Sequence, residues 1–196
     1  ICIDWLAAER AQNAIFYYTE LDHANQVTSV FGPVPAVIGA LAVLDFGDGA
    51  SLDDDTLRRR ERATAAILLA IAAVLLVLAC RARTTLPRAL LAGGIAVLSF
   101  AGAATLGQGL WQATTALPPL IAALAVIAHR EQRPRLALAA PALLLVAVMI
   151  RPTVIVLALG LGIQWALATK TRRNWLWATA IAALAVAPFV AYNAVH

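Results

Sequence analysis

Residues 63–80 read ATAAILLAIAAVLLVLAC, an apolar run without any charged side chain. A helix needs about 20 apolar residues to cross the hydrocarbon core of a bilayer, because each residue adds only about 1.5 Å. Alanine and leucine are strong helix formers, and in lipid only helices and closed barrels satisfy every backbone hydrogen bond. Ala63–Cys80 is therefore predicted to be a transmembrane helix.

Further apolar runs follow along the chain. They cover Ala89–Thr105, Trp111–Ala128, Leu136–Leu167 and Trp175–Val195. Arg151-Pro152 interrupts the longest run, which predicts either two short helices that meet at a turn or two full spans with a tight loop. The fold class predicted is all-α: a polytopic transmembrane helical bundle of five to six spans over residues 63–196.

The composition agrees with this class. Of the 196 residues, 62% are hydrophobic and 13% are charged, whereas soluble domains carry about 25% charged residues. The isoelectric point is near 9.7, but the basic side chains lie in short loops and not on one face with interleaved aromatic residues. We therefore expect membrane lipids and no nucleic acid as partners. Cys2 and Cys80 have neither metal-ligand nor disulfide-framework spacing, and no metal site is predicted.

The basic residues predict the topology of the bundle. Nine of them lie in three loops: Arg81, Arg83, Arg88, Arg130, Arg133, Arg135, Lys170, Arg172 and Arg173. The alternate loops hold only Arg151. Basic loops remain on the cytoplasmic side, so Arg151 is expected on the extracytoplasmic side. By the same alternation, the four arginines within residues 58–62 are also expected on the extracytoplasmic side. Asp53–Asp55 and Glu61 balance the charge of these arginines, and we interpret this charged segment as an amphipathic entry to the first span.

Residues 1–62 are predicted to form one extracytoplasmic loop. Within it, Val34–Phe46 is apolar but contains only about 13 residues, which fits an interfacial or re-entrant helix better than a crossing. The chain begins with Ile1, and no charged segment with a cleavage site follows. We therefore expect a fragment, or a protein whose opening helix is not included.

The acidic residues are concentrated near the start of the chain. Ten of the eleven precede residue 62, and only Glu131 follows. Any general base must then come from the N-terminal loop or from sequence outside the chain. Asp4 lies in the apolar setting Ile3–Leu6, where partial burial would shift its pKa in a way that suits catalysis. Equally, Asp4 would serve as the N-cap of a helix over Trp5–Ala14.

Two other motifs combine glycine with polar side chains. Ser29–Pro33 predicts a turn into the interfacial helix, and Gly32 there would let the backbone approach a ligand. At the start of a span, Gln108 and Gln112 could offer amide donors to a sugar or phosphate. Trp111 beside them fits an interfacial anchor as well as a binding residue.

Arg151 is the most informative single residue, because a guanidinium between two apolar runs is costly unless it meets water, a partner or an anion. Arginine pairs bidentately with phosphate, and a lipid phosphate would lie at this depth. A structural ion pair or snorkelling to the interface would also explain the residue. The chain contains no Walker loop, zinc motif or Ser-His-Asp arrangement.

The order of these motifs resembles the N-terminal half of bacterial GT-C-type membrane glycosyltransferases, which take sugars from polyprenyl-phosphate donors. The motifs are YYTE…SVFGPVPAVIGAL, then GLWQATTALPPLIAAL, then LLLVAVMIRPTVIVLAL, and the resemblance extends from about Asp4 to Leu167. It implies that Asp4 is the catalytic acid of the first extracytoplasmic loop, although the family's second acid is here Trp5. It also implies substrate-binding roles for Ser29, Gly32, Trp111, Gln112 and Arg151. Gln108 joins this set as the neighbouring amide and not through a family motif.

The leading functional hypothesis is thus a glycosyltransferase-like protein of the bacterial cytoplasmic (inner) membrane. Its donor substrate would be a polyprenyl-phosphate-linked sugar bound at the extracytoplasmic face, and no other cofactor is called for. The alternative is a non-catalytic accessory or scaffold subunit packed among other membrane subunits, which the small residues of Ala89–Thr105 favour. A transporter is disfavoured because no span carries an internal acid.

Overall fold

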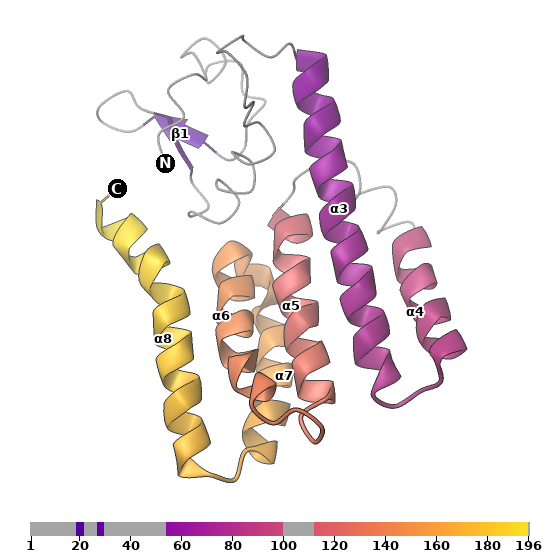
Figure 1. Cartoon of the computed structure of the whole chain (residues 1–196). Helices are drawn as coiled ribbons and strands as arrows, with labels where there is room; N and C mark the ends of the chain where they lie inside the picture. Colours follow the sequence, from indigo (N-terminus) through magenta and orange to yellow (C-terminus); the bar gives the residue numbers. More distant parts are fainter. Residues whose placement is uncertain (1–18, 22–26, 30–53, 100–111, 196) are drawn as a thin grey trace.

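The structure is a computed structural model and describes residues 19–21, 27–29, 54–99 and 112–195 (Figure 1). This part of the chain is predominantly helical. Its elements in order, with η marking 3-10 turns, are β1 (Thr19–Leu21), β2 (Val27–Ser29), α3 (Asp54–Arg81), α4 (Leu86–Leu98), α5 (Gln112–Ala128), η2 (Leu136–Ala139), α6 (Ala140–Ile150), η3 (Pro152–Val154), α7 (Ile155–Ala168) and α8 (Arg172–Val195).

The helices from α3 to α8 alternate in direction, so that each runs back along its predecessor (Figure 1). α3 packs against both α4 and α5, α5 packs against α6, and α6 contacts α7 and α8. α6 therefore lies at the centre of the second half of the bundle, whereas α4 lies at its edge. The three basic loops, at residues 81–88, 129–135 and 169–173, all lie at one end. We call it the basic end.

α3 is the longest helix and extends well before the predicted span. It begins at Asp54 and runs through the arginine cluster to Arg81, as expected for an amphipathic entry. The segment Arg62–Arg81 is the one stretch within the described residues that is long and apolar enough, by length and composition, to cross a membrane. The other apolar helices that this criterion identifies are shorter, between 10 and 17 residues.

The shorter helices match the predicted runs with shifted ends. α4 starts at Leu86, earlier than predicted, because Pro87 suits the first turn of a helix, and it ends at Leu98. α5 continues through Pro118 and Pro119. The run after Leu136 forms two helices, each between 10 and 17 residues long with its 3-10 turn, that meet at a turn at Arg151.

The antiparallel pair β1 and β2 was not predicted. Thr19 pairs with Ser29 and Leu21 pairs with Val27. Residues 19–21 and 27–29 alternate too briefly for a strand pattern to stand out from a loop. Ser29, where the sequence predicts the start of a turn, is the last residue of β2, and the rest of that motif lies outside the described residues.

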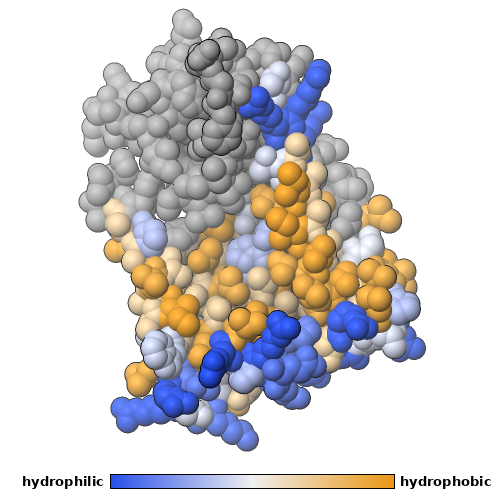
Figure 2. Space-filling model, viewed as in Figure 1, coloured by the Kyte–Doolittle hydropathy of each residue, from blue (hydrophilic) through white to orange (hydrophobic). Residues whose placement is uncertain are grey.

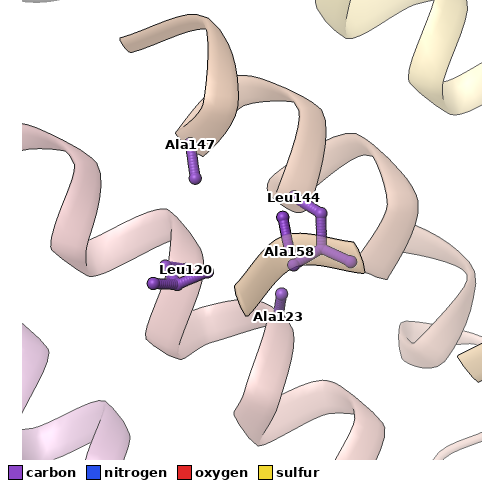
Figure 3. Packing of buried hydrophobic residues seen from close by; sticks show 5 residues of the cluster. All are labelled: Leu120, Ala123, Leu144, Ala147 and Ala158. Atoms are coloured by element: carbon purple, nitrogen blue, oxygen red, sulfur yellow. The ribbon is translucent and has the colours of Figure 1, made fainter. Parts of the chain in front are cut away.

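The bundle is packed mainly through alanine. Of 20 buried hydrophobic residues, 14 are alanine, and one cluster joins Leu120 and Ala123 of α5 to Leu144 and Ala147 of α6 and Ala158 of α7 (Figure 3). Leucine, isoleucine and valine make up most of the 23 exposed large hydrophobic residues. Small side chains therefore face the neighbouring helices and large ones point outward.

The contact between α3 and α4 is closest at Gly93. A Cβ atom added there would lie 2.5 Å from Cγ2 of Val77 and 3.5 Å from the carbonyl oxygen of Ala73. Valine is stiff at χ1, so Val77 cannot easily move away. At the adjacent Gly94 an added Cβ would meet nothing within 4 Å. The two glycines thus differ in packing although they are neighbours in one helix.

We expect Gly93→Ala to lower the free energy of unfolding by about 1–3 kcal/mol, the usual cost of overpacking a tight contact. Gly94→Ala is the matched control and should be neutral or raise stability by up to about 1 kcal/mol, because alanine favours the helix. Unfolding in detergent, followed by circular dichroism, measures both. Adding Val77→Ala should restore most of the loss in Gly93→Ala; equal stability of the two single variants would contradict this packing.

A tryptophan joins three elements near the basic end. Trp165 of α7 is 4% exposed, and its indole N–H donates a 2.7 Å hydrogen bond to the carbonyl oxygen of Ala137 in η2. The ring meets Trp175 of α8 edge to face at a centroid distance of 4.8 Å. Trp175 in turn donates to the carbonyl oxygen of Thr169 at 3.1 Å. These contacts fasten the loop before α8 to the loop before α6.

Candidate functional site

The backbone at Arg151 is shaped by the proline that follows it. A residue before proline is disfavoured in the helical region, and Arg151 is extended, with φ −142° and ψ 101°. Its N–H donates to the carbonyl oxygen of Ala147 at 3.0 Å and so completes the last turn of α6. Its own carbonyl oxygen accepts from the N–H of Val154 at 3.1 Å. The sequence Ile150-Arg151-Pro152 therefore ends one helix and starts the next.

The Arg151 side chain is oriented by its second neighbour. Nε of Arg151 donates a 2.8 Å hydrogen bond to Oγ1 of Thr153. The guanidinium is half-buried, Thr153 is exposed, and the terminal nitrogens of Arg151 make no hydrogen bond to the described residues. Those nitrogens carry the paired donors that suit a phosphate or carboxylate. Thr153 thus orients the guanidinium through Nε, and the terminal nitrogens make no hydrogen bond within the part of the chain that the structure describes.

This turn lies at the end of the bundle opposite the basic loops, as the alternation of helix directions requires (Figure 1). α5 begins at the same end of the bundle, with Gln112 as its first residue. The strands β1 and β2, including Ser29, are drawn at this end as well. Asp4, Gly32, Gln108 and Trp111 lie outside the described residues. 

No carboxylate after residue 62 can neutralise Arg151. The only acidic residue in that part of the chain is Glu131, which lies in the loop after α5, at the basic end. An unpaired guanidinium between apolar helices is expensive, so an anion from outside residues 62–196 is its natural partner. One of the ten acidic residues before residue 62, or a bound phosphate, would satisfy this requirement.

Two buried hydroxyl groups close to the start of α5 were not singled out from the sequence. Thr114 and Thr115 are 1% and 2% exposed, and both have interaction partners. They are the buried polar residues of the described part of the chain. In the sequence they are a pair of threonines separated from Gln112 by Ala113, within an otherwise apolar helix. They add polar atoms near the end of the bundle that carries Arg151.

The basic end, opposite the Arg151 turn, is lined by hydrophilic side chains. Figure 2 shows hydrophilic side chains gathered along this end, below a broad band of hydrophobic ones. The three loops there contain nine arginine and lysine residues and one acid, Glu131. Arg151 and the basic loops are therefore separated by the full length of the apolar band.

The fold and site together define a helical bundle with an apolar waist, a strongly basic end and an oriented arginine at the other end. Within the described residues, no group of three or more histidine, cysteine or acidic side chains could hold a metal ion. No protein-family model, curated protein or solved structure matches this chain. Its function must therefore be argued from its own residues.

Proposed function

We propose that the chain is a polytopic membrane protein that binds a polyprenyl-phosphate-linked sugar at its non-basic end and transfers the sugar. The membrane location is supported by which side chains are buried between the helices and which are exposed. Alanine fills the helix contacts, and leucine, isoleucine and valine point outward, for example Leu98 at 80% and Leu167 at 81% exposed. In water this arrangement would be unfavourable, whereas in lipid small residues favour close helix packing and large apolar ones face the acyl chains.

Helix lengths are compatible with this proposal. Arg62–Arg81 has 20 residues, which corresponds to about 30 Å, the thickness of a bilayer's hydrocarbon core. Thr114–Ala128, Leu136–Ile150 and Pro152–Ala168 correspond to about 22–26 Å and would cross a thinned bilayer, at a modest cost for each ångström of mismatch. Leu86–Ala96 corresponds to only about 16 Å and is too short to cross. The basic end would then be cytoplasmic and Arg151 extracytoplasmic. A bacterial cytoplasmic membrane is the setting that the sequence resemblance suggests.

The membrane orientation can be tested at the two ends of α3. In a variant without native cysteines, Arg59→Cys is expected to react with a membrane-impermeant maleimide added to intact cells, because that end would face outward. Thr84→Cys should react only after the membrane is permeabilised. Both positions are exposed in the structure. Labelling of both in intact cells, or of Thr84→Cys alone, would contradict the orientation.

The transfer reaction follows from the chemistry of the proposed ligands. Arg151 would bind the donor phosphate through its terminal nitrogens, and Thr153 would keep the guanidinium in position. Asp4 would remove the proton from the acceptor hydroxyl, whose oxygen attacks the anomeric carbon. The bond from that carbon to the phosphate oxygen breaks, and polyprenyl phosphate leaves with inversion. Ser29, Gly32, Gln108, Trp111 and Gln112 would line the sugar.

The direct test is a transfer assay on the purified chain in a bilayer mimic, supplied with a radiolabelled polyprenyl-phosphate sugar. Release of polyprenyl phosphate that depends on an added acceptor is the expected result. A chain that folds but neither binds nor consumes the donor would contradict the proposed enzyme.

The second candidate function is a scaffold within a larger membrane complex. α4 favours it, because the face formed by Leu90, Leu91, Ile95 and Leu98 is between 54% and 80% exposed, and the principal contact of α4 is with α3. A scaffold would be recovered from membranes with a stoichiometric partner and would lose that partner when Leu91 and Leu98 are replaced. An enzyme acting alone would be purified without one.

A further inference from the structure

The basic end contains more positive charge than the acidic residues of its own three loops can neutralise. The nine basic residues there are accompanied by Glu131 alone. Most of their side chains are exposed, among them Arg133 and Arg135 after α5, Lys170 before α8 and Arg172 at the start of α8. Such an excess attracts anions from its surroundings, and the attraction is strong only within a Debye length, about 10 Å at moderate salt.

The loops that carry this charge are held together by specific contacts. The 2.7 Å hydrogen bond from Trp165 to Ala137 and the edge-to-face contact between Trp165 and Trp175 connect the loop after α5 with the loop after α7. η2 also packs against α8. The two loops that carry these six basic residues are therefore held in fixed relative positions, so their backbones need little reordering when a ligand binds.

The surroundings of this surface are those of a membrane interface. Trp175 and Trp177, in the first turns of α8, are 42% and 59% exposed and lie between the basic loops and the apolar band. Tryptophan prefers this depth, where one part of the ring meets acyl chains and the other meets headgroups. α8 also begins with Arg172 and Arg173 and has no acidic residue in its first turn, so an external anion would relieve their repulsion from the positive end of the helix.

We propose that the basic end binds the headgroups of anionic phospholipids, with the loops at residues 129–135 and 169–173 as the contact surface. This inference rests on the proposed membrane location but not on sugar transfer, which would occur at the other end. A lipid is favoured over a soluble polyanion because the charge is continuous with exposed tryptophans and an apolar band, which a soluble anion would not use.

Native mass spectrometry of the full chain in detergent tests this proposal. With phosphatidylglycerol and phosphatidylcholine supplied at equal concentration, we expect bound phosphatidylglycerol to exceed phosphatidylcholine by about tenfold, since each basic residue near a headgroup adds measurably to the attraction. The double variants Arg133→Gln/Arg135→Gln and Lys170→Gln/Arg172→Gln should each reduce the ratio severalfold. Arg59→Gln/Arg62→Gln removes the same charge at the other end of α3 and should leave it unchanged.

The outcomes separate this inference from the proposed function. Equal binding of the two lipids, or equal loss in the control variant, would overturn the headgroup surface while leaving a membrane protein. Binding of neither lipid would overturn both proposals. Displacement of phosphatidylglycerol by millimolar inorganic phosphate or ATP would assign the surface to a soluble anion and reject the lipid.

Discussion

Trp165→Ala is expected to lower the free energy of unfolding by about 3–5 kcal/mol, the usual cost of removing a large buried aromatic side chain. Trp165 is buried in a cluster with Ile127, Ala140 and Ala178, which come from α5, α6 and α8. Three small or medium side chains cannot close the space that the indole would leave. Because α7 meets these neighbours at this point, loss of the ring should loosen the whole basic end.

Two further substitutions separate the volume of Trp165 from its hydrogen bond. Trp165→Phe keeps most of the ring and removes the donor to Ala137, whose carbonyl oxygen still accepts from the N–H of Ala140. A loss of only about 1 kcal/mol is therefore expected. Trp177→Ala is the matched control, since Trp177 is 59% exposed and lies in the same region.

Thermal or denaturant unfolding in detergent, followed by circular dichroism, would rank the three variants. The expected order of stability is Trp177→Ala, then Trp165→Phe, then Trp165→Ala. A Trp165→Ala variant as stable as Trp177→Ala would mean that the basic end is not held together by this residue. The surface proposed for lipid headgroups would then lose its support as well.

The positions of the helices could be predicted from the sequence because apolar runs and their interruptions have local causes. Ala63–Cys80 lies within α3, and the break at Arg151 follows from a charge and a proline placed together. The alternation of basic loops likewise predicted that Arg151 and the loop at residues 129–135 would lie at opposite ends. Each of these inferences needed only neighbouring residues.

Packing between helices could not be predicted in the same way. A helix that is apolar on every side has no clear amphipathic pattern, so nothing in the sequence indicates that Ala147 faces a neighbour while Leu145 is exposed. The hydrogen bond from Trp165 to Ala137 joins residues 28 positions apart and has no local signature. The strand pair at Thr19–Leu21 is too short to be recognised by alternation.

In the candidate site, too, the residues with a local sequence pattern could be predicted and those placed by helix packing could not. Arg151 could be identified because a charge between apolar runs is costly wherever it occurs. Its partner Thr153 is two residues away and belongs to the motif already quoted. Thr114 and Thr115 are buried by helix packing, which no local pattern specifies. The placement of Asp4 at the same end as Arg151 is implied by the resemblance alone and stays a prediction.

Arg151→Gln is expected to reduce kcat/KM for sugar transfer by about 100-fold, because a charge-assisted, bidentate contact to the donor phosphate would be lost. Asp4→Asn should abolish transfer while donor binding remains, since the amide cannot accept the proton of the acceptor hydroxyl. Arg151→Gln is therefore expected to impair binding of the donor, and Asp4→Asn is expected to impair the chemical step. Donor binding measured separately from transfer distinguishes them.

Arg151→Lys decides whether Arg151 acts through its charge or through its geometry. Lysine would serve equally well if Arg151 only snorkelled to the interface, whereas a bidentate phosphate contact should lose about tenfold in kcat/KM. Thr153→Val should lower activity severalfold by releasing Nε of Arg151, and Thr153→Ser should restore it. Arg59→Gln, an exposed arginine in the first part of α3, is the control. Full activity in both Arg151→Lys and Thr153→Val would exclude an oriented phosphate contact at Arg151.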